Sequence, residues 1–126
     1  MHPAATSITT FGLYAVATGI GLTLVPELVL SPLGIPAPTE IWIRMVGALA
    51  VPLGYYYWVC GRANAVAFFH ASVHGRIVFA ALLALLVARF AAPVQLLLFA
   101  GIDLAGAAWT AYGLRTAARA ESGTPV

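Results

Sequence analysis

Long apolar runs alternate along the chain with short breaks, and four of these runs are long enough to cross a lipid bilayer. A bilayer core about 30 Å thick requires about 20 consecutive apolar residues in an α-helix. Runs of this length lie at about 9–30, 40–60, 65–90 and 93–114. The pattern therefore predicts an all-α, integral membrane bundle of four transmembrane helices, with residues 1–126 forming a single domain.

The breaks between the runs contain residues that end helices. The first break, SPLGIPAPT, holds three prolines and a glycine, and it cannot continue a helix. We expect Asn64 to cap the third helix and Pro93 to occupy the first turn of the fourth. Pro26 and Pro52 lie inside runs, where they should bend the helices. The polar tail that follows Leu114 is expected to fray.

Composition supports lipid as the solvent of this chain. It is 62% hydrophobic and 8% charged, whereas an average soluble domain is about 25% charged. The basic residues are six arginines, too few for a nucleic-acid surface, so no nucleic-acid partner is expected. The single cysteine, Cys60, excludes an internal disulfide, and we interpret it as a small buried hydrophobe. The first ten residues contain no Lys or Arg, so we expect the first run to be a membrane helix and not a signal peptide.

The arginines predict an orientation. With four spans, the two termini and the second loop share one side, which holds Arg62, Arg115 and Arg119. The opposite side holds Arg89, with Arg44 just inside the second span. Because positive charges favour the cytoplasmic side, we expect both termini to be cytoplasmic.

Two charges fall near the middle of apolar runs. Arg76 is about halfway along the third run and Asp103 about halfway along the fourth. A charge is costly in lipid, so a buried ion pair between these residues is the simplest expectation. Helical spacing puts Ser72 on the face of Arg76, and Asp103 in a stripe with Gln95, Gly106 and Thr110. The pair is interpreted either as a clasp between two helices or as a site for ligand binding or proton transfer.

Two histidines lie on another face of the third run. His70 and His74 are four residues apart and point roughly opposite to Arg76. They could chelate a metal only with a third ligand, which the sequence does not obviously supply. We therefore expect neither a metal nor a cofactor. Hydrogen bonds to the second helix are the simpler interpretation, and a protonation-sensitive role is the alternative.

Polar groups also gather in the first two runs. Glu27, Glu40 and Arg44 are expected to form a salt-bridge network at one end of these helices. Tyr14 and Thr18 share one face of the first run and place hydroxyl groups inside the bundle. The aromatic run Tyr55–Trp58, together with Trp109 and Tyr112, is interpreted as an interfacial belt or as the lining of a ligand pocket.

Several of these residues carry a family resemblance. The patterns GLY…TG…L.PE, W.R..G…LG.YY, GR and D..GA.WT, over roughly residues 11–115, resemble small bacterial membrane proteins of the DoxX-like kind. The resemblance implies a four-helix bundle in a bacterial inner membrane. It fixes little of the biochemistry, although some such proteins look like accessory subunits of membrane oxidoreductase systems. A broader relation to sterol-isomerase-like bundles would imply an apolar ligand in a central cavity. The first two runs, however, lack the acid–acid or His–Glu pattern that such isomerase chemistry would use.

Three functions follow as expectations. The first is an accessory or assembly subunit of a larger membrane complex, whose partners would be the bilayer and other subunits or a homo-oligomer. The second is a binding protein for a small lipid-soluble molecule. The third is an isomerase- or cyclase-type enzyme in which Asp103 is the catalytic acid or base. The candidate ligand-binding residues are Arg76, Asp103, Ser72, His70, His74, Tyr14 and Arg44.

Overall fold

Helices joined by short loops make up the part of the chain that the structure describes, and no strand occurs in it. The computed structural model describes residues 2–36 and 38–123. In chain order the elements are α1 (Ala5–Leu24), α2 (Pro26–Leu30), the 3₁₀-helix η1 (Ser31–Leu33), α3 (Trp42–Arg62), α4 (Val66–Phe90) and α5 (Leu96–Glu121). The all-α prediction is confirmed. Three of these helices, α1, α4 and α5, are long and apolar enough to cross a membrane.

The helix α3 differs from the other three long helices in its apolar content. It is 21 residues long, but its mean hydropathy is lowered by Arg44, Pro52 and the aromatic run Tyr55–Trp58. Residues 2–36 and 38–123 also form five α-helices instead of the expected four, because α2 is a separate short helix. Four membrane spans therefore remain a prediction.

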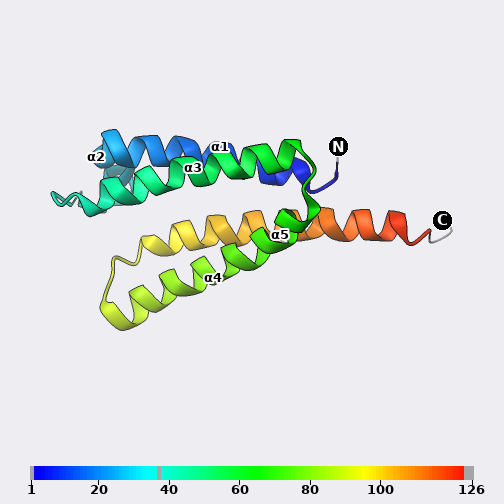
Figure 1. The fold of residues 1–126 in the computed structure, drawn as a ribbon. Coiled ribbons are helices and arrows are strands. Elements are labelled where there is room, and N and C mark those ends of the chain that lie inside the picture. Colours follow the sequence, from blue (N-terminus) through cyan, green and yellow to red (C-terminus); the bar gives the residue numbers. More distant parts are fainter. Residues whose placement is uncertain (1, 37, 124–126) are drawn as a thin grey trace.

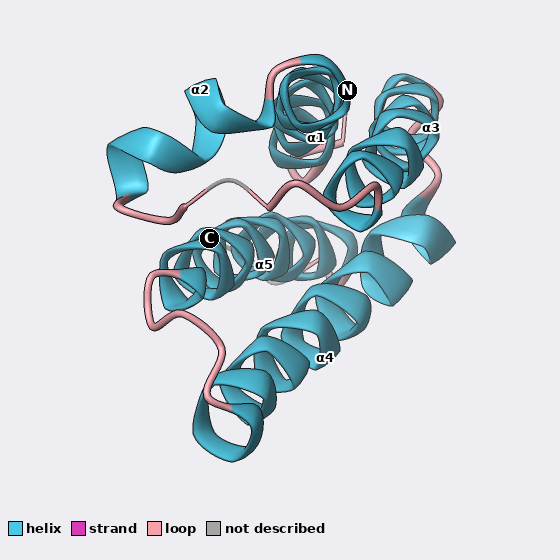
Figure 2. Ribbon diagram, turned by 90° about the vertical axis from the view of Figure 1, so that its left-hand side faces the viewer, coloured by secondary structure: helices cyan, strands magenta, loops and turns pink. Residues whose placement is uncertain are grey.

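The long helices form two antiparallel pairs (Figure 1). α1 packs along α3, α4 packs along α5, and α1 also contacts α5. Both termini lie at one end of the bundle, here called the terminal end, and α2 lies at the opposite end. Figure 2, viewed from the α2 end, shows α4 diverging from the α1–α3 pair as it approaches the viewer. α4 is thus close to α3 at the terminal end and separated from it at the α2 end, whereas the start of α5, at Leu96, still packs against the cluster of Leu22 and Leu30 there.

Glycines set the short distance between α1 and α3. A Cβ atom on Gly12 would lie 2.7 Å from the carbonyl oxygen of Gly54, and one on Gly19 would lie 2.7 Å from that of Gly47. Within each helix the two glycines are seven residues apart, so they share one face. The opposing backbones therefore meet directly, which is the packing that small residues permit between apolar helices.

Buried side chains close both ends of the bundle. At the terminal end, Ala4, Ala5, Ile8, Tyr57 and Phe69 form one apolar cluster. The N-terminal segment is held there by the His2 amide, which donates to Asn64 Oδ1 at 2.8 Å, and by packing of Ala4 on Gly113. At the α2 end, a second cluster joins Leu22, Leu30 and Ile35, so α2 and the following loop cover that end.

Pro26 breaks the first run instead of bending it. α1 ends at Leu24, Val25 has a non-helical backbone (φ −140°, ψ 63°), and Pro26 begins α2. A residue that precedes proline disfavours the helical region, which explains the break. The expected network of Glu27, Glu40 and Arg44 is wrong, because Arg44 instead donates to the free helix-end carbonyls of Thr23 (2.7 Å) and Leu24 (3.1 Å).

Three other helix boundaries differ from the prediction. Asn64 does not cap α4: it adopts a left-handed conformation (φ 52°) just after α3, and Ala65 precedes α4 without a side-chain cap. Pro93 lies before α5 and not in its first turn. α5 continues to Glu121, so the expected fraying after Leu114 is also wrong for this part of the chain. Its last turns are rich in alanine and arginine, which favour helices strongly. Residues 124–126 of the tail lie outside the described residues.

Substitution of Gly54 by leucine should destabilise the bundle, because its Cβ would lie 2.5 Å from the carbonyl oxygen of Gly12. Overpacking of this kind costs about 1–3 kcal/mol, so we expect a lower Tm in thermal unfolding of the purified protein. Gly101→Leu is the matched control, since no atom lies within 4 Å of a Cβ there. Equal losses of Tm in the two variants would contradict the close α1–α3 contact.

Candidate functional site

A cavity of about 440 Å³ lies between the two helix pairs. Its walls are mostly apolar and come from α1, α3, α4 and α5, with Leu30 of α2 at one end. The polar residues that line it are Tyr14, Thr18, Tyr57, Arg76 and Asp103. The cavity therefore combines a largely apolar surface with one cationic and one acidic side chain, and we treat it as the candidate site.

Arg76 is the most constrained polar side chain of the site. Only 3% of its surface is exposed. Its Nε donates to the carbonyl oxygen of Ser72 at 3.2 Å, and its Nη2 donates to the Ser72 hydroxyl at 3.3 Å and to Thr110 Oγ1 at 2.7 Å. Nη1 is buried and has no hydrogen-bond partner among the described residues. The guanidinium thus joins α4 to α5 and keeps one donor group unused.

Further groups position the guanidinium from all four long helices. The Thr110 hydroxyl oxygen lies 2.7 Å from that of Ser7 on α1, which adds the N-terminal helix to the network. The ring centroids of Phe11 and Tyr57 lie 4.8 and 5.7 Å from the guanidinium carbon, within the range of cation–π attraction. Gly106 provides the space, because a Cβ there would lie 2.8 Å from Nη1 of Arg76.

Asp103 is buried beside this network but does not pair with Arg76. It is 8% exposed, and within residues 2–36 and 38–123 its carboxylate makes neither a salt bridge nor a hydrogen bond. The expected ion pair is therefore wrong. The physical reason is that Ser72 and Thr110 already hold the guanidinium, from their own helices. Both residues instead line one cavity, and the unpaired Nη1 of Arg76 is buried beside Gly106 and Phe11.

The structure brings together only part of the predicted site. Tyr14, Arg76 and Asp103 all line the cavity, whereas Ser72 lies behind the guanidinium and accepts its hydrogen bond. Arg44 of α3 lies outside the cavity, at the α2 end of the bundle, where it bonds to the last residues of α1. Gln95 precedes α5 and is not a lining residue, although Gly106 and Thr110 of the predicted stripe do contact Arg76.

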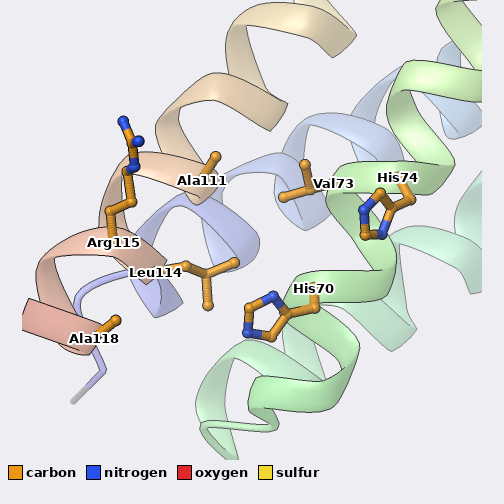
Figure 3. Close-up of a pocket in the computed structure, with 7 residues that line it drawn as sticks. All are labelled: His70, Val73, His74, Ala111, Leu114, Arg115 and Ala118. Atoms are coloured by element: carbon orange, nitrogen blue, oxygen red, sulfur yellow. The ribbon is translucent and has the colours of Figure 1, made fainter. Parts of the chain in front are cut away.

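His70 and His74 lie outside the cavity, in a groove between α4 and α5 (Figure 3). This groove has a volume of about 270 Å³ and is lined by His70, Val73, His74, Ala111, Leu114, Arg115 and Ala118. Both imidazoles are exposed, and Arg115 points away from them in Figure 3. The expected hydrogen bonds to the second helix are not formed, because this face of α4 borders α5 and not α3. The two histidines therefore do not belong to the candidate site.

The aromatic run on α3 divides between two environments. Tyr55, Tyr56 and Trp58 are 57%, 56% and 39% exposed, as in a belt, whereas Tyr57 is 6% exposed and lines the cavity. Phe11 is the aromatic site residue that the sequence interpretation missed, and for Tyr57 the alternative interpretation, the lining of a pocket, agrees with its position. Helical spacing carried the signal, because Tyr57 lies on the same face of α3 as Gly54 and Gly61, which contact α1.

The cavity has no ligand set for a metal ion. Among the described parts of the chain, no three His, Cys, Asp or Glu side chains gather closely enough to hold one. Cys60 is a free, half-buried thiol on α3. The chemistry that the cavity does provide is hydrogen bonding, with donors at Arg76 and Tyr14 and an acidic side chain at Asp103.

Removal of the Thr110 hydroxyl should destabilise the protein more than removal of an exposed one. In Thr110→Val, Arg76 loses a 2.7 Å acceptor and remains buried, which costs about 1–3 kcal/mol. The matched control is Thr116→Val, whose hydroxyl donates only to the Tyr112 carbonyl at an exposed position. A Tm loss in Thr110→Val no larger than that in the control would show that the network contributes little to stability.

Comparison with protein-family models, with curated proteins and with solved structures finds no match to this chain. The resemblance to DoxX-like proteins therefore stays a prediction, and the site is interpreted from its own geometry.

Proposed function

We propose that this chain is an integral membrane protein with four spans, formed by α1, α3, α4 and α5. The support is that α3, although less apolar, packs along the whole of α1 and would have to cross the bilayer with it. Large apolar side chains are also exposed on every long helix, for example Leu13, Leu49, Val78 and Ile102. An apolar surface of this extent is stable in lipid and costly in water. The arginine distribution supports an orientation with both termini cytoplasmic, and the resemblance to DoxX-like proteins supports a bacterial inner membrane.

Within this architecture we propose that the protein binds a small lipid-soluble molecule in the cavity between the helix pairs. The observation that carries this proposal is the pair of buried, oppositely charged side chains that face one cavity without forming a salt bridge. A buried charge normally pairs with its neighbour. Here the fold holds Arg76 through Ser72 and Thr110, and leaves Asp103 without a hydrogen bond from any described residue. A polar ligand group beside Asp103 would supply that hydrogen bond.

The size and lining of the cavity suit such a ligand. Its 440 Å³ falls within the range of about 300–1,000 Å³ that is typical of small-molecule sites. Ligand sites are mostly apolar with a few convergent polar groups, and this cavity has that composition. Tyr14 and Thr18 add hydroxyl groups on the α1 side.

The other expected functions remain predictions. An isomerase or cyclase would use the same cavity, with Asp103 as the acid or base and Arg76 or Tyr14 polarising the substrate. An accessory subunit, in a larger complex or a homo-oligomer, would instead use the exposed helix faces. The experiments below separate these functions by what the protein carries and by which residues matter.

Native mass spectrometry of the protein, extracted gently from its own membranes, should detect one defined small mass bound to the chain. Gly75 lines the cavity and has open space around it, so Gly75→Leu should fill part of the cavity and remove that mass. Gly101→Leu, a glycine with equal space outside the cavity, should retain it. Attached protein chains without a small mass would favour the accessory subunit. Retention of the mass in Gly75→Leu would place the ligand elsewhere.

Substitution of Asp103 by asparagine should weaken ligand binding by about tenfold or more, because the ligand loses a charge-assisted hydrogen bond. The measurement is the fraction of protein that carries the small mass, compared with the same fraction in the wild type. The comparison is valid when the variant and the wild type have the same Tm. Glu40→Gln is the control, since this exposed acid lies outside the cavity. Equal occupancy in both variants would exclude Asp103 from the site.

The topology has its own test. A fluorescent protein fused after α5 should fold and fluoresce in bacterial cells, because the C-terminus is expected on the cytoplasmic side. Alkaline phosphatase at the same position should be inactive, whereas phosphatase inserted into the loop between α4 and α5 should be active. The reverse pattern would invert the proposed orientation.

A further inference from the structure

We propose that the ligand is a neutral, hydroxyl-bearing lipid that enters the cavity directly from the bilayer, through the seam between α3 and α4. This inference rests on the proposed function and names the class and route of the ligand. It follows from three observations on the described residues. Both ends of the bundle are closed by packed side chains, the seam between α3 and α4 is not packed, and the polar side chains of the cavity carry no net charge together.

Both ends of the bundle are closed to a ligand that approaches from water. The terminal end is filled by the cluster that includes Ile8 and Phe69, each 0% exposed. The Ser7–Thr110–Arg76 network lies beneath this cluster. At the other end, Leu22, Leu30 and Ile35 pack under α2 and the loop that follows it. A ligand could pass either end only by displacing this packing.

Three of the four seams between helices are also closed. α1 packs on α3 through the glycine contacts, α4 packs on α5, and α1 contacts α5. Among the described residues, α3 and α4 show no comparable packing, and Figure 2 shows the two helices diverging toward the α2 end. The α3–α4 seam is therefore the remaining route.

The side chains along this seam both line the cavity and reach the outer surface. Val46 and Leu53 of α3 are 54% and 49% exposed, and Phe79 of α4 is 49% exposed. Gly75, which has no side chain, is also exposed and lines the cavity. In the proposed topology this surface faces lipid, so an apolar molecule dissolved in the bilayer meets an apolar opening with no aqueous step.

The lining also sets the direction in which the ligand lies. Tyr14 and Arg76 are near the middle of their helices and Asp103 is about two turns into α5, whereas the lining nearer the α2 end is apolar and includes Leu22, Ile43 and Leu96. The polar end of the ligand therefore lies deep in the bundle, and its apolar body extends toward α2. This arrangement fits an amphiphile with a small head group and a single chain or a narrow ring system.

The charges favour a neutral head group. Arg76 and Asp103 together have no net charge, so an anionic head group would add a like charge near Asp103, and a cationic one near Arg76. A hydroxyl is the smallest group that both donates and accepts a hydrogen bond. It can donate to the Asp103 carboxylate, which has no hydrogen bond from a described residue, and accept from the Tyr14 hydroxyl beside it.

The head group can be tested with photoreactive probes. The protein is placed in phosphatidylcholine nanodiscs with a diazirine-bearing hexadecanol, with its methyl ether or with the matching hexadecanoic acid. After illumination, peptide mass spectrometry locates the adducts. We expect the alcohol to label cavity residues such as Leu22 and Phe99, and the ether, which has no hydroxyl donor, to label them at least about tenfold less. Stronger labelling by the acid than by the alcohol would overturn the neutral class.

The route can be tested by closing the seam. Leu53→Cys and Phe79→Cys are combined in a Cys60→Ala background and joined with a bifunctional maleimide. We expect the joined protein to take up the alcohol from donor vesicles about tenfold more slowly than the same variant before joining. The control joins Val73→Cys to Ala111→Cys in the same background, across the outer α4–α5 groove, and should not slow uptake.

A second comparison does not depend on the cysteine variants. Phe79→Ala should open the seam and accelerate uptake of the alcohol, whereas Phe90→Ala, which removes a 66% exposed ring outside the cavity, should not. Unchanged uptake in both the joined protein and Phe79→Ala would overturn the lateral route while leaving the proposed function intact. Absence of cavity labelling by any probe in the wild type would instead reject the proposed function.

Discussion

The guanidinium of Arg76 is the constraint on which the rest of this bundle depends. A permanently charged group inside an apolar structure requires compensation from nearly every direction, and α1, α3, α4 and α5 each contribute to it. Thr110 and Ser72 accept its hydrogen bonds, Phe11 and Tyr57 present their rings, and Gly106 leaves it room. The position of this one side chain therefore fixes how the two helix pairs approach each other.

The two pairs are held in different ways, and the cavity results from that difference. Within the first pair, glycines bring α1 and α3 together along their length. Between the pairs, α3 and α4 are close at the terminal end, where Phe69 and Tyr57 are buried and the Arg76 network lies. Toward α2, α4 separates from α3 while Leu96 of α5 still packs against the cluster that includes Leu22, and no charged side chain lines that part of the cavity. The cavity is therefore an apolar space that lies beside the polar side chains of Arg76, Asp103 and Tyr14.

The approximate positions of the long helices, and the presence of Arg76, Asp103 and Tyr14 at one site, could be predicted from hydrophobic periodicity. The hydrogen-bond partners of these side chains could not be predicted in the same way. Arg76 had two possible partners, an acid on a neighbouring helix or hydroxyl and carbonyl groups nearer to it, and only the geometry of packing decides between them. Arg44 is a similar case, because the carbonyls it binds became available only when Pro26 ended α1 early.

Other differences have equally local causes. Tyr57 reads in sequence as one of four adjacent aromatic residues, and only its angular position on α3 sets it apart. His70 and His74 were placed correctly on a face away from Arg76. The neighbour of that face depends on how the helix pairs cross, and this crossing is not encoded in the spacing of residues along one helix.

The hydrogen bond between Ser7 and Thr110 has a consequence for biosynthesis. These residues are separated by 103 positions along the chain, yet each supplies part of the same buried network. During translation, α1 and α3 emerge first and can associate through their glycines before α5 has been made. Until Thr110 arrives, Ser7 can bond only to the Ala4 carbonyl, and Arg76 only to Ser72 on its own helix. The buried hydrogen-bond network of the N-terminal half therefore remains incomplete until α5, the last helix to be synthesised, packs against α1.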